Sequence, residues 1–90
     1  MYKIIFSKQA SKEKQFLKSS NLEEKAKTIL IKMSEDPFCY PPSYEKLSGD
    51  FRGLFSRRIN RQHRIVYKVN NVKKEIYIIT MWTHYDNVKY

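Results

Sequence analysis

The chain has 90 residues, of which 41% are hydrophobic, so we expect one globular domain, residues 1–90, rather than a disordered protein. Eighteen Lys and Arg against nine Asp and Glu leave a formal charge of +9, which favours a polyanionic partner, most often a nucleic acid. No apolar run is long enough to span a bilayer, and the single cysteine, Cys39, excludes an intrachain disulfide, so we expect a cytoplasmic protein with no membrane partner.

The first residues predict a strand followed by a helix. The run Tyr2–Phe6 is rich in β-branched and aromatic side chains and has the length of a short strand. Ser7 can cap a helix that continues to about Lys18, because a serine hydroxyl accepts a hydrogen bond from a free N–H group of the first turn. The apolar residues of this helix form only a weak stripe, made of Ala10, Phe16 and Leu17.

A second helix has the clearer pattern. Asn21 followed by Glu24 resembles a capping box, in which each side chain binds a backbone N–H group of the first turn. We expect the helix to end before Pro37, since proline disfavours the helical conformation in the residue before it. The apolar residues that recur at helical spacing are Leu22, Ala26, Ile29, Leu30 and Met33.

The second half of the chain predicts a loop and then a meander. Residues 34–50 carry all three prolines and one of the two glycines, which indicates an ordered loop. Three strands follow, at about Arg52–Ile59, His63–Val69 and Glu75–Trp82, joined by short polar connections at 60–62 and 70–74. This order predicts an α+β domain with both helices on one face of a largely antiparallel sheet.

The middle strand of the meander has two unlike faces, because successive side chains of a strand point to opposite sides. Ile65, Tyr67 and Val69 share one face with His63 and can pack beneath the helices. The other face carries Arg64, Val66 and Lys68, a mixed set that is expected to face solvent or a ligand.

Cationic side chains cluster around this strand: Arg57, Arg58, Arg61, His63 and Arg64. If the hairpin folds symmetrically about Arg61, Arg58 lies opposite Arg64, and two guanidinium groups so placed repel each other unless an anion lies between them. A phosphate fits there, because arginine binds phosphate through paired hydrogen bonds. Alternatively, each arginine pairs with an acid or reaches water. We expect Arg57 and Arg61 to attract RNA from outside.

Two further places carry side chains suited to acid–base chemistry. His84 and Tyr85 directly follow the last apolar strand, where a rigid scaffold meets solvent, and histidine is well suited to proton transfer near neutral pH. Glu45 follows a proline-rich segment that can hold it at the edge of the basic cluster. For each of these residues the alternative is an ordinary solvated side chain.

Three separated parts of the chain together resemble one known family. They are Glu45, the segment 47–67 (LSGDFRGLFSRRINRQHRIVY) and the pair His84 and Tyr85, which have the order and spacing seen in the YoeB/Txe toxins of the RelE superfamily. The match from Glu45 to Tyr67 needs no gap. The first half resembles the family only in its strand–helix–helix order and in the turn at Asp36–Phe38.

The resemblance implies a RelE-like microbial RNase fold and an endoribonuclease that cleaves mRNA in the ribosomal A site. Such an enzyme needs neither a metal nor another cofactor. The roles it implies are a general base at Glu45, a phosphate contact at Arg64, a general acid at His84, a substrate-positioning residue at Tyr85, and supporting positions at Arg58 and His63.

The resemblance also implies the partners. A toxin of this type is neutralised by a cognate antitoxin of the YefM/Axe kind, acts on the ribosome and its mRNA, and reaches operator DNA only through the antitoxin complex. A homodimer is compatible with it.

Two other readings of the sequence stay open. A non-catalytic RNA- or DNA-binding module would use the same arginines as phosphate anchors, although it would need neither Glu45 nor His84. A structural or protein-interaction domain would predict no salt-dependent binding of RNA, and an acidic protein partner would also suit the positive charge.

Overall fold

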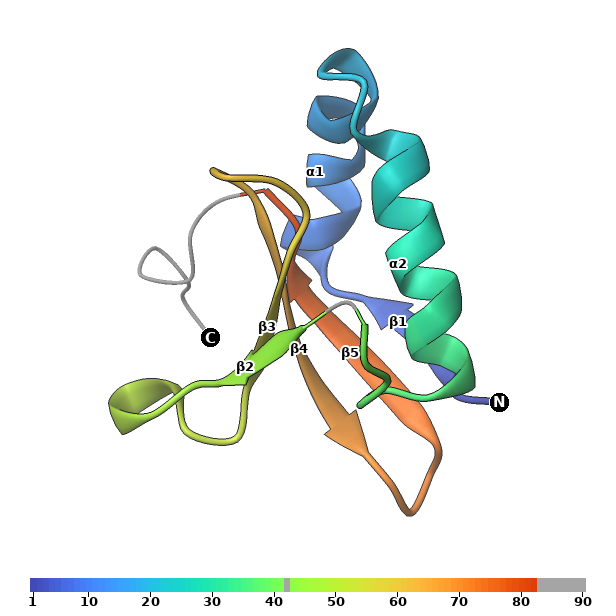
Figure 1. Ribbon diagram of the computed structural model, residues 1–90, viewed down its shortest axis with the longest axis vertical. Coiled ribbons are helices and arrows are strands. Elements are labelled where there is room, and N and C mark those ends of the chain that lie inside the picture. Colours follow the sequence, from blue (N-terminus) through green and yellow to red (C-terminus); the bar gives the residue numbers. More distant parts are fainter. Residues whose placement is uncertain (42, 83–90) are drawn as a thin grey trace.

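The computed structural model describes residues 1–41 and 43–82, which form two helices and one five-stranded sheet (Figure 1). The strand order is β1-β5-β4-β3-β2, with β1 parallel to β5 and every other pair antiparallel. The predicted α+β class and the meander of β3, β4 and β5 are confirmed. The strands are β1 (Lys3–Phe6), β2 (Tyr44–Lys46), β3 (Phe55–Arg58), β4 (Arg64–Asn70) and β5 (Glu75–Thr80).

The helices are α1 (Lys8–Ser19) and α2 (Glu23–Glu35). The predicted cap of α1 is confirmed, since Ser7 Oγ accepts a hydrogen bond of 2.9 Å from the backbone N–H of Ala10. The predicted capping box of α2 is wrong. Asn21 has φ of 59°, and the N-cap position is taken by Leu22, which offers no side-chain acceptor. The end of α2 before Pro37 is as predicted.

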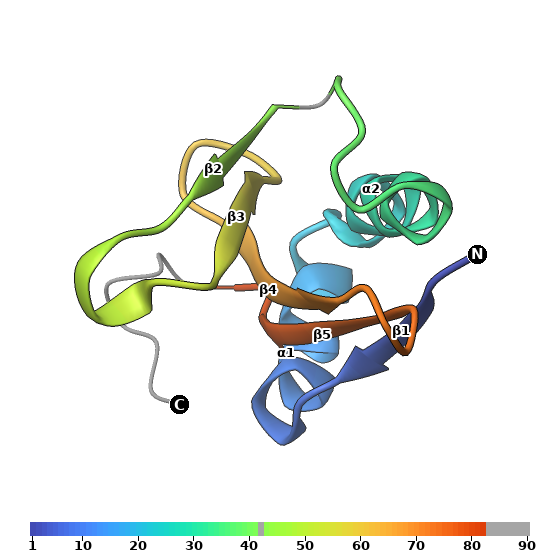
Figure 2. The same cartoon turned by 90° about the horizontal axis from the view of Figure 1, so that it is seen from below.

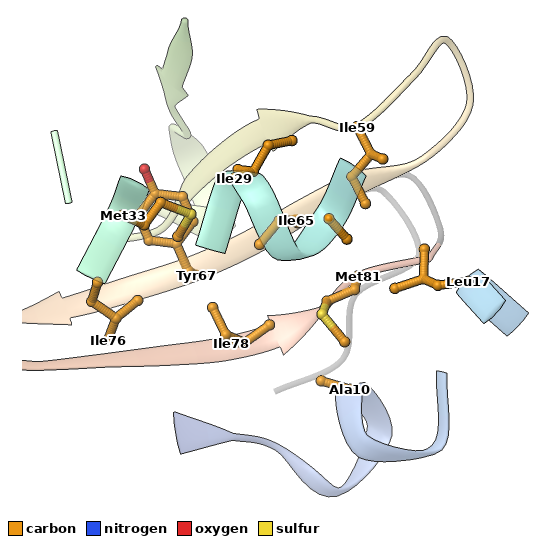
Figure 3. Close-up of a cluster of buried hydrophobic side chains, with 11 residues drawn as sticks. Ala10, Leu17, Ile29, Met33, Ile59, Ile65, Tyr67, Ile76, Ile78 and Met81 are labelled. Carbon is orange, nitrogen blue, oxygen red and sulfur yellow. The ribbon is translucent and has the colours of Figure 1, made fainter. Parts of the chain in front are cut away.

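Both helices pack their apolar sides onto one face of β4 and β5 (Figure 3). The face of β4 that was expected to be buried is buried, because Ile65 and Tyr67 are both 0% exposed. Apolar burial of this kind is the main source of stability in a domain of this size. The buried cluster consists of Ala10, Leu17, Ala26, Ile29, Met33, Ile59, Ile65, Tyr67, Ile76, Ile78 and Met81.

The segment between β2 and β3 covers part of the opposite face of the sheet (Figure 2). It contains a short 3₁₀ helix, η1 (Gly49–Phe51), and two glycines with positive φ: Gly49, the first residue of η1, at 64°, and Gly53, which follows η1, at 95°. Leu47 and Leu54 from this segment bury Val66, which is 0% exposed. The expectation that Val66 faces solvent or a ligand is therefore wrong.

Two predicted boundaries also differ from the structure. The loop expected at 34–50 contains β2 and η1, and the strand expected from Arg52 starts only at Phe55, because residues 52–54 complete the turn around Gly53. Neither helix in the described ranges has the length and apolar character needed to cross a membrane.

Candidate active site

An asparagine side chain stabilises the hairpin between β3 and β4, together with a backbone hydrogen bond of 2.8 Å from the N–H of Ile59 to the carbonyl of His63. Asn60 Oδ1 accepts hydrogen bonds from the backbone N–H groups of Gln62 (2.9 Å) and His63 (2.8 Å), the usual way in which an asparagine side chain stabilises a turn. This turn fixes the register in which Arg58 lies directly opposite Arg64. The predicted pairing of the two arginines is confirmed.

The edge strand β2 brings a carboxylate to the same face of the sheet. Glu45 pairs with Ser56 in the β2–β3 register, and Ser56 is two residues before Arg58, so these side chains point to the side away from the helices. A hollow of about 190 Å³ lies there. Its lining residues are Ser43, Tyr44, Glu45, Ser56, Arg58 and Arg64.

Arg64 forms the floor of this hollow, and Glu45 forms its rim. The distance between Arg64 Nη1 and Glu45 Oε1 is 3.7 Å, and the exposed fractions of the two side chains are 11% and 58%. An ion pair of this length leaves both groups able to bind a third group. Arg58 is exposed and lines the same hollow. The hollow thus combines an accessible carboxylate with two guanidinium groups.

Two buried polar atoms at the hollow have no hydrogen-bond partner within the described part of the chain. They are Ser56 Oγ and Arg64 Nε. A buried donor without a partner costs about 1–3 kcal/mol, so a phosphate oxygen that accepts from either group would recover part of that free energy. Ser56 was not among the predicted site residues. Its position two residues before Arg58 in a strand was the signal that could have identified it.

Arg57 is not a surface residue, so the expectation that it attracts RNA from outside is wrong. Its side chain is 0% exposed and lies on the helix side of the sheet. Nη2 donates to the carbonyls of Pro37 (2.9 Å) and Cys39 (3.0 Å), and Nε donates to Tyr67 Oη (3.2 Å). Arg57 therefore anchors the segment that leads into β2.

His63 and Arg61 lie outside the hollow. The imidazole of His63 stacks on the indole of Trp82, with ring centroids 3.9 Å apart, and its Nδ1 contacts the carbonyl of Trp82. His63 thus packs against the end of β5, away from the two facing arginines. Arg61 is exposed at the tip of the hairpin, as expected.

The end of β5 is held by a buried carboxylate of α1. Glu13 is 5% exposed and accepts hydrogen bonds from Thr80 Oγ1 (2.8 and 2.9 Å) and from the backbone N–H of Met81 (2.9 Å). Together with the stacking of Trp82 on His63, this contact holds residues 80–82 next to the hairpin. His84 and Tyr85, the predicted acid and positioning residue, lie outside the described residues.

The order of elements and the hollow can now be compared with known proteins. A family profile described as the YoeB-like toxin of bacterial type II toxin–antitoxin systems matches residues 6–85. Toxin YoeB of Synechocystis sp. is 36% identical over 73 residues, which are 81% of this chain and 76% of that protein.

Two solved structures are similar over almost the whole chain. The YoeB/ParE toxin from Agrobacterium tumefaciens has a TM-score of 0.83 and 27% identity, and the match covers 92% of this chain and 99% of that chain. The heterotetrameric YoeB–YefM toxin–antitoxin complex from Staphylococcus aureus has a TM-score of 0.78 and 28% identity, covering 94% and 99%. These similarities confirm the predicted RelE-like fold. Because the family profile spans both helices and strands β2 to β5, the chain belongs to the YoeB-like toxins of bacterial type II toxin–antitoxin systems.

Proposed function

We propose that this toxin is an endoribonuclease that cleaves mRNA on the ribosome and so blocks translation. The observation that carries the proposal is the meeting of Glu45, Arg58 and Arg64 around one hollow on the face opposite the helices. A basic hollow with an accessible carboxylate is suited to the cleavage of a phosphodiester whose nucleophile belongs to the substrate.

The chemistry has three parts. RNA carries its own nucleophile, so a base must remove the proton of a 2′-hydroxyl, and Glu45 is the accessible carboxylate at the hollow. The attack builds negative charge on the phosphorane, which the guanidinium groups of Arg64 and Arg58 stabilise. An acid must then protonate the departing 5′-oxygen.

The third part rests on the family resemblance. His84 is proposed as the general acid and Tyr85 as the residue that positions the substrate. The products would carry a 2′,3′-cyclic or 3′-phosphate on one side and a 5′-hydroxyl on the other. No step in this scheme requires a metal ion.

The proposed protein partner is an antitoxin of the YefM kind, because the similar toxin from Staphylococcus aureus was solved in a YoeB–YefM complex. An acidic or disordered antitoxin segment that folds on binding would suit the +9 charge of the chain. Operator DNA would be bound through that complex.

A reconstituted translation system tests the enzymatic part of the proposal. Wild type, Glu45→Gln, His84→Ala and the exposed control Lys12→Gln are added to the same mRNA with and without ribosomes, and new 5′-hydroxyl ends are mapped by sequencing. We expect cleavage only with ribosomes, full activity for Lys12→Gln, and losses of about 10²–10⁴-fold for the other two variants.

Intact mRNA with wild-type protein under all conditions would overturn the enzymatic proposal and favour a non-catalytic RNA-binding module. Full cleavage by Glu45→Gln and His84→Ala would overturn the roles of these two residues while leaving the reaction in place.

A further inference from the structure

A second depression lies between α2 and the β3–β4 hairpin. Its volume is about 550 Å³, larger than that of the hollow at Glu45. Pro41, from the segment that follows α2, belongs to its lining. The lining residues are Lys25, Thr28, Ile29, Lys32, Pro41, Arg58, Ile59, Asn60 and Arg61, and we call this depression the α2 groove.

Four cationic side chains border the α2 groove, and none of the carboxylates in residues 1–41 and 43–82 lines it. Lys25 and Lys32 are seven residues apart on α2, which places them on one side of the helix, and Arg58 and Arg61 face them from the hairpin. All four are exposed, and none forms an ion pair within the described ranges. Like charges gathered in this way repel each other, so a polyanion bound among them gains favourable electrostatic free energy.

The floor and the polar rim of the groove are fixed by the fold. Ile29 and Ile59 form the floor and belong to the buried cluster (Figure 3), with exposed fractions of 6% and 1%. Asn60 uses its Oδ1 to close the hairpin turn, which leaves its amide nitrogen as a donor at the rim. Thr28 Oγ1 donates to the carbonyl of Glu24 (3.0 Å), so its exposed hydroxyl offers the groove an acceptor only. The α2 groove therefore offers hydrogen-bonding groups held by secondary structure.

Arg58 lines both the α2 groove and the hollow that contains Glu45 and Arg64. A strand whose phosphate lies between Arg58 and Arg64 has to leave the hollow, and the α2 groove continues from the same arginine. We propose that the α2 groove binds the sugar–phosphate backbone of single-stranded RNA next to the cleaved phosphodiester, with Lys25 and Lys32 contacting its phosphates. This inference rests on the proposed endoribonuclease function.

Binding of an RNA that cannot be cleaved tests the inference. A short, single-stranded 2′-O-methyl RNA has its nucleophile blocked and keeps its phosphates, and its affinity is measured by fluorescence anisotropy over a series of salt concentrations. The test variant is Lys25→Gln/Lys32→Gln. The matched control is Lys8→Gln/Lys12→Gln, which removes two exposed lysines of α1 that do not line the groove.

Each phosphate contact with a single strand contributes about 0.7 to the slope of log K against log salt. The test variant should therefore have a slope shallower by about 1.4, and its affinity at about 0.1 M salt should be roughly 25-fold lower than that of wild type. The control variant should keep both values close to those of wild type.

Equal behaviour of the test and control variants would overturn the inference. A second outcome would also overturn the inference: the test variant binds the RNA like wild type but loses affinity for a glutamate-rich peptide of the same charge as the RNA. The α2 groove would then bind an acidic protein segment. Ribosome-dependent cleavage by wild type separates the two proposals. If wild type cleaves mRNA and the test variant behaves like the control, only the proposed RNA binding by the α2 groove is overturned. If the test variant loses RNA affinity as expected and wild type cleaves no mRNA, the enzymatic proposal is overturned and RNA binding by the groove is retained.

Discussion

Arg58 and Arg64 face each other across β3 and β4, the first exposed and the second buried, on the side of the sheet away from the helices. Like charges directly opposite each other on neighbouring strands destabilise a sheet. Glu45 lies at 3.7 Å from Arg64 and offsets only part of this repulsion. The pair is thus unfavourable for folding alone, which supports the proposal that this face of the sheet binds a phosphate.

The first prediction separates stability from activity at Arg58. Arg58→Gln removes the repulsion and should raise the free energy of unfolding by about 0.5 kcal/mol. It also removes one group that stabilises the phosphorane, so ribosome-dependent cleavage should fall by about 10²-fold. Urea unfolding and the cleavage assay measure the two effects. Arg61→Gln, at the hairpin tip, is the control for stability, and a loss of stability in Arg58→Gln would contradict the prediction.

The second prediction concerns the carboxylate at the rim. Glu45→Gln should lower kcat by about 10²–10⁴-fold, because the base is lost. Its affinity for non-cleavable RNA should stay the same or increase, because a negative charge is removed from a phosphate site. Single-turnover cleavage and anisotropy measure these quantities separately. Glu35→Gln, exposed at the end of α2, should match wild type in both. Weaker RNA binding by Glu45→Gln would argue that Glu45 has a structural role.

The third prediction uses the anchoring role of Arg57. Arg57→Lys should lower the free energy of unfolding by about 2–4 kcal/mol, because one ammonium group cannot reproduce the planar fork that reaches Pro37, Cys39 and Tyr67. A surface arginine that only attracts RNA would tolerate this change. Arg58→Lys, which keeps an exposed charge, is the matched control in urea unfolding. Similar stabilities of the two variants would show that the buried contacts contribute little.

The register of the β3–β4 hairpin was predictable from sequence because it depends only on the position of the turn and on the alternation of side chains along each strand. Strand alternation and a short polar turn place Arg58 opposite Arg64 without knowledge of any distant residue. The same alternation puts Arg57 on the opposite face from Arg58. Its burial depends on the carbonyls of Pro37 and Cys39, which lie 20 and 18 residues away and become neighbours only in the folded chain.

Two local elements were missed for a related reason. The strand β2 has only three residues and follows a proline-rich segment, so nothing in its own sequence alternates; it exists because it pairs with β3. The start of α2 has the sequence of a capping box, but Asn21 takes a left-handed conformation in the tight connection from α1. The α2 groove was also not predicted, since it needs α2 and the hairpin to be adjacent.

The last prediction follows from the buried phenol of Tyr67. Burial raises its pKa from 10.0 to about 12, against the opposing effect of the Arg57 guanidinium. The folded protein therefore keeps the Tyr67 proton at pH values where the unfolded chain loses it. The contribution of the protonated Tyr67 to the free energy of unfolding is fully present below about pH 10. It is lost as the pH rises toward about 12, and the total loss is about 2–3 kcal/mol.

Tyr67→Phe should remove this dependence on pH. It should also lower the free energy of unfolding at neutral pH by about 1–2 kcal/mol, because Arg57 Nε loses its acceptor and Pro37 loses a donor. Wild type and variant should therefore approach each other in stability between about pH 10 and 12. Urea unfolding across this range measures the difference, with Tyr40→Phe, whose ring is exposed, as the control. If the difference in free energy of unfolding between wild type and Tyr67→Phe stayed constant across this pH range, folding would not raise the pKa of Tyr67. The contribution of Tyr67 to stability would then not depend on its protonation.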